Sequence, residues 1–178
     1  CTPLGATVSI VTEGREVWAR AWLYVIKSHL GEQLPVLFLD TDLPENNAVD
    51  RELIHFLYGG DETYRFKQEI VLGIGGVRML RALGLRVRKY HMNEGYAALL
   101  ALELLRASQA YTEDLRPGES PYDVSLVRSQ CEFTTHTPVG AGRDEFDYAV
   151  VARLWPGFVQ DAALRQLGGA GRLDMSRL

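Results

Sequence analysis

The pattern of hydrophobic and polar positions changes its period several times along the chain, and each change predicts a secondary-structure element. Short runs rich in β-branched, aromatic or aliphatic residues predict strands at 7–12, 17–26, 35–39, 87–92 and 131–135. Apolar residues at helical spacing predict helices at 53–57, 97–110, 122–130, 148–155 and 160–167. A longer helix is predicted between Asp61, a candidate N-cap, and Gly84, a candidate C-cap. Polar, glycine-rich or proline-containing segments predict a turn at 13–15 and loops at 40–47, 116–121, 137–147 and 168–171.

From residue 35 onward, strands alternate with helices. This order is typical of an α/β layer built on a mostly parallel sheet with flanking helices. No internal repeat or low-complexity tract divides the 178 residues, so they form one domain or part of one. The chain starts at Cys1, close to a strand-like run, and ends at Leu178 without an evident closing element. We therefore expect a piece of a larger domain.

Two polar clusters follow predicted strands and are the candidates for chemistry. The first is His-Met-Asn-Glu-Gly-Tyr at 91–96, and the second is Thr-Thr-His-Thr-Pro at 134–138. Ligands of open parallel sheets bind beyond the carboxyl ends of the strands, and the segment between the clusters is long enough for a crossover connection. The clusters could therefore meet in one crevice. Their hydroxyls, amide, carboxylate and imidazoles suit a sugar, which needs many directional hydrogen-bond partners.

Each cluster also has a purely structural interpretation. Asn93 could serve only as a helix N-cap, and Glu94 as a first-turn acid that suits the helix dipole. His136 could be a histidine whose hydrogen bonds are satisfied within a turn. His91, Glu94 and His136 could in principle bind a metal, but their spacing matches no zinc-hydrolase motif.

Two other segments resemble ligand-binding loops and favour structural roles. Gly-Ile-Gly-Gly at 73–76 lies inside a helical pattern rather than between a strand and a helix start, which favours close helix packing over a phosphate loop. The acidic segment 40–50 lacks the glycine that an EF-hand loop requires, which favours a solvated loop.

Composition narrows the class of protein. Hydrophobic residues make up 47% and charged residues 24%, which is typical of globular proteins. The formal net charge of -4 argues against a nucleic-acid-binding domain, which usually carries a basic face. Cys1 and Cys131 form no metal-type motif, which favours reduced thiols and a cytoplasmic location. No apolar run reaches the ~18–20 residues of a membrane span, and no signal peptide opens the chain.

Several motifs follow one another in a fixed order. They are Phe-Leu-Asp-Thr-Asp at 38–42, Pro-Glu-Asn at 44–46, Leu-Tyr-Gly-Gly-Asp at 57–61, Arg65, Gln-Glu-Ile-Val-Leu-Gly-Ile-Gly-Gly-Val-Arg at 68–78, His-Met-Asn-Glu-Gly at 91–95 and Phe-Thr-Thr-His-Thr-Pro at 133–138. Together they resemble the bacterial and archaeal branch of the α-glucan (glycogen, maltodextrin) phosphorylases. The resemblance extends from about residue 8 to 155, and the segment 172–178 is similar to a further family motif. Several independent motifs in one order are far more specific than any one of them.

The resemblance implies a glycosyltransferase-B enzyme, with two Rossmann-like domains facing a deep cleft. Residues 1–178 would form part of the N-terminal, glucan-binding α/β domain. Such enzymes split α-1,4-glucan or maltodextrin with inorganic phosphate and release α-glucose 1-phosphate with retention. Their cofactor, pyridoxal 5′-phosphate, is bound by a lysine of the C-terminal domain. That domain is absent from these residues, and Lys27, Lys67 and Lys89 match no cofactor site, so we expect the chain alone to be inactive.

The same resemblance implies roles for individual residues. His136 would be catalytic, with its backbone carbonyl facing the positive charge that develops on the sugar and its ring bonded to the 6-hydroxyl. Asn93, Glu94, Tyr96 and Thr137 would bind substrate, Asn93 and Glu94 on the acceptor side of the cleft. No metal site is implied.

The chain departs from the family pattern at three positions. Tyr96 and Arg143 stand where the family usually has histidines, and Gly140 stands in place of a common proline. Tyr96 keeps a donor and an acceptor but lacks the imidazole, so the affinity for glucan could differ. Two other functions stay open: a nucleotide-sugar-dependent glycosyltransferase of the glycogen or starch synthase type, and a non-catalytic carbohydrate-binding domain. Oligomeric state and allosteric control also stay open.

Overall fold

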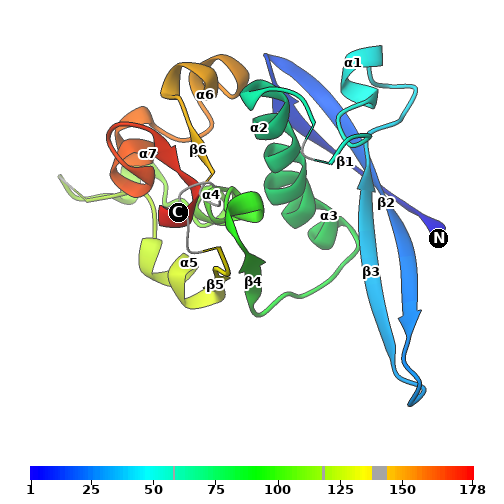
Figure 1. Ribbon diagram of the computed structural model, residues 1–178. Helices are drawn as coiled ribbons and strands as arrows, with labels where there is room; N and C mark the ends of the chain where they lie inside the picture. Colours follow the sequence, from blue (N-terminus) through cyan, green and yellow to red (C-terminus); the bar gives the residue numbers. More distant parts are fainter. Residues whose placement is uncertain (58, 118, 138–143) are drawn as a thin grey trace.

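A computed structural model describes residues 1–57, 59–117, 119–137 and 144–178 (Figure 1). Its strands are β1 (Thr2–Thr12), β2 (Arg15–Lys27), β3 (Gln33–Asp40), β4 (Tyr90–Asn93), β5 (Cys131–Thr134), β6 (Glu145–Phe146) and β7 (Leu173–Asp174). Its α-helices are α1 (Ala48–Arg51), α2 (Glu62–Ile70), α3 (Gly76–Ala82), α4 (Leu100–Ala107), α5 (Val124–Gln130), α6 (Tyr148–Leu154) and α7 (Asp161–Gly168). Shorter helical turns are η1 (Val71–Gly75), η2 (Gly95–Ala97), η3 (Thr112–Asp114) and η5 (Met175–Arg177). The mixed α/β class predicted from the sequence is confirmed.

The largest sheet is antiparallel, with the order β1-β2-β3. Only Glu13 and Gly14 separate β1 from β2, with φ of 52° and 73°, the backbone signature of a tight hairpin turn. Residues 28–32 connect β2 to β3, and connections this short allow only antiparallel neighbours. Among the described residues, parallel pairing is confined to β4 and β5. The expectation of a mostly parallel sheet is therefore wrong for the larger sheet.

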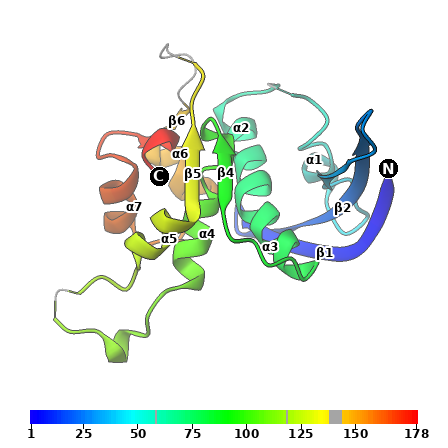
Figure 2. The same ribbon diagram turned by 90° about the horizontal axis from the view of Figure 1, so that it is seen from below.

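One face of the antiparallel sheet is covered by a continuous helical rod that comprises α2, η1 and α3 (Figures 1 and 2). The Asp61 side chain caps the rod by accepting a hydrogen bond from the Tyr64 amide at 2.9 Å. The rod ends before Gly84, whose φ of 73° suits glycine. Both predicted helix boundaries are confirmed, and the π-helical turn η1 in the middle was not foreseen.

The helix predicted at 53–57 is wrong. The helix in this region is α1, which starts after Asn47 because the Asn47 side chain accepts a hydrogen bond from the Asp50 amide at 2.9 Å. Arg15 donates to both oxygens of Asp50, at 2.7 and 2.8 Å, and so holds α1 against the hairpin turn. Residues 52–57 form turns that still bury Leu53. Local capping therefore overrides the apolar spacing.

The second half of the chain packs on the other side of the rod. β4 and β5 lie side by side, with α4 and α5 packed against them (Figure 2). Phe66 of α2 joins the two halves, because its ring centroid lies 4.8 Å from that of Phe146 and 6.3 Å from that of Trp155. No helix among the described residues is long and apolar enough to cross a membrane.

Gly73 is a close-packing position, as the sequence predicts for the segment 73–76. A Cβ atom there would lie 2.9 Å from the Leu100 amide nitrogen and 3.0 Å from the Leu99 Cβ atom. We expect Gly73→Ala to lower the free energy of unfolding by ~1–3 kcal/mol, because backbone is the obstacle. Gly76→Ala is the matched control: no atom lies within 4 Å of its added Cβ, and alanine favours a helix by roughly 0.5–1 kcal/mol. Urea denaturation compares the two, and equal midpoints would contradict the packing role.

Candidate functional site at the ends of β4 and β5

The two polar clusters meet at one edge of the parallel strand pair. β4 and β5 align Asn93 with Thr134, and the Glu94 amide continues the pairing by donating to the Thr134 carbonyl at 2.9 Å. The carboxyl ends of both strands therefore point the same way, and residues 91–96 and 134–137 lie together (Figure 2). The predicted approach of the two clusters to each other is confirmed, and a shared crevice between them stays a prediction.

Glu94 is the centre of this arrangement. Its Oε1 atom accepts hydrogen bonds from the amides of His136 and Thr137, at 2.6 and 3.1 Å, and from the Thr137 hydroxyl at 3.2 Å. Its Oε2 atom accepts from the Thr135 hydroxyl at 3.0 Å. The residue is only 8% exposed and holds a φ of 61°, a backbone region that side chains rarely adopt. Glu94 thus folds back over the β5 end, and it makes no helix-cap bond.

The pKa of Glu94 is lowered below its usual value of 4.5, and the largest cause is the hydrogen bond from the His136 amide. Hydrogen bonds from Thr135 and Thr137 lower it further, whereas burial acts in the opposite direction. A carboxyl whose pKa is lowered in the folded chain stabilises the fold above its unfolded pKa. This stabilisation is lost as the pH falls through the lowered value. Near neutral pH, the ionised carboxylate therefore fastens residues 135–137 to β4.

The imidazole of His136 is oriented by Asn93. The His136 Nε2–H donates to the Asn93 Oδ1 atom at 2.8 Å, because an amide oxygen can only accept. In the tautomer that this bond corresponds to, Nε2 carries the proton and Nδ1 can accept a hydrogen bond from a ligand. Both side chains are exposed to solvent. Asn93 therefore bonds to His136, and the alternative interpretation of Asn93 as only a helix N-cap does not hold.

His91 does not join this cluster. Its Nε2 atom lies 2.6 Å from the hydroxyl of Thr134, the last residue of β5, which precedes the segment 135–137 that Glu94 binds. Among the residues that the structure describes, no group of three or more His, Cys, Asp or Glu side chains could hold a metal ion. Pro138, Gly140 and Arg143 lie outside the described residues.

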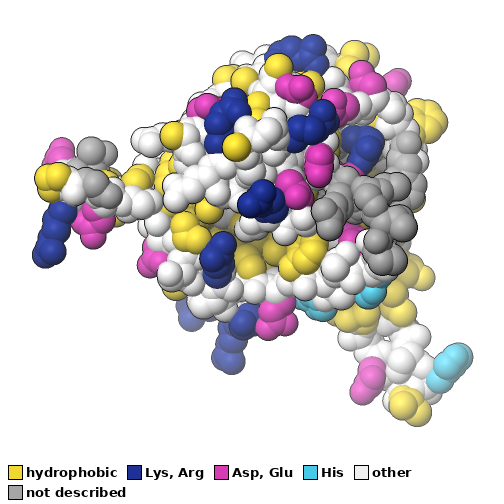
Figure 3. All heavy atoms as spheres, turned by 60° about the vertical axis from the view of Figure 1, so that its left-hand side comes forward, with side chains coloured by type: hydrophobic (Ala, Val, Ile, Leu, Met, Phe, Trp, Pro, Cys, Tyr) yellow, Lys and Arg dark blue, Asp and Glu magenta, His cyan; other side chains and the backbone are white. Residues whose placement is uncertain are grey.

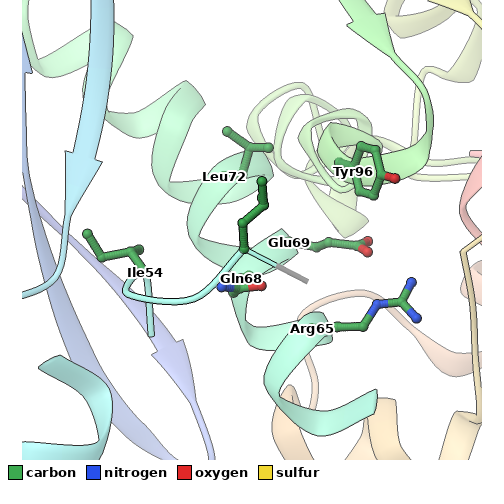
Figure 4. A pocket seen from close by; sticks show the side chains of 7 residues that line it. Ile54, Arg65, Gln68, Glu69, Leu72 and Tyr96 are labelled. Carbon is green, nitrogen blue, oxygen red and sulfur yellow. The ribbon is translucent and has the colours of Figure 1, made fainter. Parts of the chain in front are cut away.

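Tyr96 lines a separate cavity of about 340 Å³ between the rod and the turns before it. The cavity is lined by Ile54, Leu57, Arg65, Gln68, Glu69, Leu72 and Tyr96 (Figure 4). Asn93, Glu94, His136 and Thr137 do not line it. Four of the predicted site residues, Asn93, Glu94, His136 and Thr137, therefore lie together, whereas Tyr96 lines this separate cavity.

Glu69 is the residue of this cavity that sequence reasoning missed. It is 4% exposed, and its Oε2 atom has no hydrogen-bond partner among the described residues. Figure 4 shows its carboxyl group between Tyr96 and Arg65. Burial raises the pKa of Glu69 to about 8 against the opposing charge of Arg65, which itself forms an ion pair with Asp144. The sequence feature that could have revealed this burial is the position of Glu69, at helical spacing within the apolar stripe of Phe66 and Ile70.

The three lysines of the chain lie at separate places in the fold. The Lys67 ammonium donates to Glu13 at 2.8 Å and is 6% exposed as a residue. The Lys89 ammonium lies 3.3 Å from Glu132 at the surface, and Lys27 is exposed at the end of β2.

Comparison with known proteins finds close relatives over most of the chain, although no family model matches it. It is 43% identical over 143 residues to glycogen phosphorylase of Mycobacterium tuberculosis, which covers 76% of this chain and 15% of the relative. It is 36% identical over 165 residues to maltodextrin phosphorylase of Thermococcus litoralis, which covers 93% of this chain and 19% of the relative. Glycogen phosphorylase of Aquifex aeolicus is 28% identical over 156 residues, which is 81% of this chain and 21% of the relative.

These similarities define the class: the chain is homologous to α-glucan phosphorylases. Its particular relatives are glycogen and maltodextrin phosphorylases of bacteria and an archaeon, which confirms the resemblance seen in the motifs. The chain spans less than a fifth of the length of the first two relatives described above, at 15% and 19%.

Proposed function

We propose that these residues supply part of the glucosyl-binding wall of an enzyme that phosphorolyses α-1,4-glucan. In this reaction a phosphate oxygen bonds to C1 of the terminal glucosyl unit, the bond from C1 to the glucan oxygen breaks, and that oxygen takes up a proton. The products are α-glucose 1-phosphate and a glucan shorter by one unit. The names of the relatives, glycogen phosphorylase and maltodextrin phosphorylase, support this substrate class.

The observation that carries the proposal is the hydrogen-bonded cluster of Asn93, Glu94, His136 and Thr137 at adjacent strand ends. A sugar at this edge would meet the imidazole of His136, whose second ring nitrogen offers a hydrogen-bonding group. The His136 carbonyl would serve as a fixed dipole near C1, where positive charge develops. The position of that carbonyl depends on the His136 and Thr137 amides, both of which bond to Glu94. We therefore assign His136 the catalytic role and Glu94 a positioning role.

Thr137 and Asn93 complete the wall with hydroxyl and amide groups. Tyr96 lines the cavity that also contains Glu69, so we do not include it in the proposed sugar-binding surface. The chain would form part of the N-terminal Rossmann-like domain of a glycosyltransferase-B enzyme in the cytoplasm. Phosphate and pyridoxal 5′-phosphate would then be held by polypeptide outside these residues.

The test is an assay of the full-length polypeptide with maltodextrin, inorganic phosphate and pyridoxal 5′-phosphate. We expect α-glucose 1-phosphate to form, and to form only when phosphate is present. Transfer of glucose from a nucleotide sugar without phosphorolysis would instead identify a synthase-type glycosyltransferase. Glucan binding with neither reaction would identify a carbohydrate-binding protein. Either result would refute the proposal.

A further inference from the structure

The outer face of the antiparallel sheet, turned away from the helical rod, is apolar. On the inner face, Val8, Ala19 and Ala21 pack with Met79 of α3. Side chains alternate between the faces of a strand, so the residues between these positions lie on the outer face. There the register aligns Trp22 with Phe38, Tyr24 with Val36 and Ile26 with Leu34.

These outer side chains are largely open to solvent in the described structure. The exposed fractions are 47% for Tyr24, 46% for Ile26, 61% for Leu34 and 51% for Phe38. An antiparallel sheet with one face in water normally carries polar residues at alternate positions, whereas a sheet buried on both faces is apolar throughout. The sequence from 17 to 26 follows the second pattern, with Arg20 as its one charged residue.

Three polar side chains on this face, those of Arg20, Trp22 and Asp40, bond to one another. The Arg20 Nε and the Trp22 Nε1 atoms both donate to Asp40, at 3.0 and 2.8 Å. The Arg20 guanidinium carbon also lies 4.9 Å from the centre of the Trp22 ring. A covering layer would therefore meet the charge of Arg20 already paired with Asp40 rather than as a lone charge, which would be far more costly to bury.

The far part of the β2–β3 hairpin projects beyond the helices that cover the rest of the sheet (Figure 1). Figure 3 shows hydrophobic side chains along this projection at the lower right. An isolated two-stranded hairpin is marginally stable in water, and contiguous exposed apolar surface usually marks an interface. The antiparallel sheet is thus covered by helices on one face and leaves apolar side chains exposed on the other.

We propose that the outer face of β2 and β3, including the projecting hairpin, is an intramolecular interface covered by apolar side chains of polypeptide outside residues 1–178. The relatives support this occupant, because the chain accounts for only 15% and 19% of two of them and the rest of their length is available for such a layer. A glucan fits the face less well, because the aliphatic Ile26, Leu34 and Val36 offer no hydrogen bond to a hydroxyl. The inference is independent of the proposed reaction.

Thiol labelling of the full-length polypeptide tests the interface. Ile26→Cys places a thiol on the outer face, and Leu30→Cys places one at the hairpin turn, where the leucine is 90% exposed. Maleimide reaction at each site is followed by mass spectrometry under native conditions and in urea. We expect native Ile26→Cys to react at least ~10²-fold more slowly than in urea, as buried segments do, and Leu30→Cys to react freely. Comparable native and urea rates for Ile26→Cys would overturn the proposal.

A second copy of the chain is the competing occupant. If protection of Ile26→Cys disappears on dilution together with a fall in mass by sedimentation velocity, the cover is another copy and the proposal is wrong. Protection that persists in the monomer supports it. Should Ile26→Cys fail to fold, Leu34→Cys, its cross-strand partner, gives the same readout.

Discussion

Replacing Glu69 with glutamine is expected to stabilise the folded chain at pH 8 and to change its stability little at pH 5. In the folded chain, burial raises the pKa of Glu69 to about 8, whereas the ordinary value is 4.5. The folded state therefore keeps a proton that the unfolded state releases. The free energy of unfolding falls as the pH rises from 4.5 to 8, by at most roughly 1.4 kcal/mol per pH unit from this group.

Glutamine does not ionise, so the free energy of unfolding of the variant does not fall with rising pH through this position. The difference in unfolding free energy between Glu69→Gln and the parent sequence should grow from pH 5 to pH 8 and then level off. Urea denaturation at several pH values measures it directly. Glu45→Gln, at an exposed loop position, is the matched control and should change stability by less than ~0.5 kcal/mol at every pH. A Glu69→Gln difference that stays constant with pH would show that the carboxyl is ionised throughout.

His136→Ala in the full-length enzyme should lower kcat/KM for maltodextrin phosphorolysis by ~10²-fold or more, as loss of one contact to the transition state does. The variant removes the ring that would bond a sugar hydroxyl and the anchor provided by Asn93. His29→Ala, an exposed histidine in the turn of the β2–β3 hairpin, should leave the kinetics unchanged. Unchanged kinetics for His136→Ala would remove this residue from the site.

Glu94→Gln separates positioning from contact. An amide presents one oxygen in place of two and directs its own N–H groups at the donors of residues 135–137, so the His136 backbone should shift. We expect kcat to fall by more than KM rises, because a misplaced carbonyl weakens transition-state binding rather than ground-state binding. Amide exchange at His136 and Thr137 should become faster in the same variant, a change that a simple substrate contact would not produce.

Sequence patterns located most elements, and the errors have identifiable causes. The caps at Asp61 and Gly84 were predictable because each depends on one residue type in a fixed local geometry. The helix at 53–57 was mispredicted because Asn47 starts a helical turn earlier and an ion pair from Arg15 holds it there. The parallel sheet was overestimated because a strand–helix alternation says nothing about which strands become neighbours, whereas the short connections at 13–14 and 28–32 do.

The candidate site, too, could be predicted only in part. Asn93, Glu94, His136 and Thr137 could be selected because they follow strands, and parallel neighbours bring such ends together. Their division of labour could not be predicted, since it depends on the unusual backbone of Glu94, which turns the carboxylate toward β5. Glu69 was overlooked because a charged residue inside an apolar stripe reveals its burial only when the opposing cavity wall is known.

One carboxylate, at position 94, serves four donors from three consecutive residues of a distant segment. A single substitution at position 94, 135 or 137 leaves its former partners with mismatched hydrogen-bonding groups, whereas position 136 contributes only its backbone amide. Evolutionary drift at this edge of the fold therefore has to proceed through coupled replacements, and positions 94, 135 and 137 should vary as a set among descendants of a common ancestor.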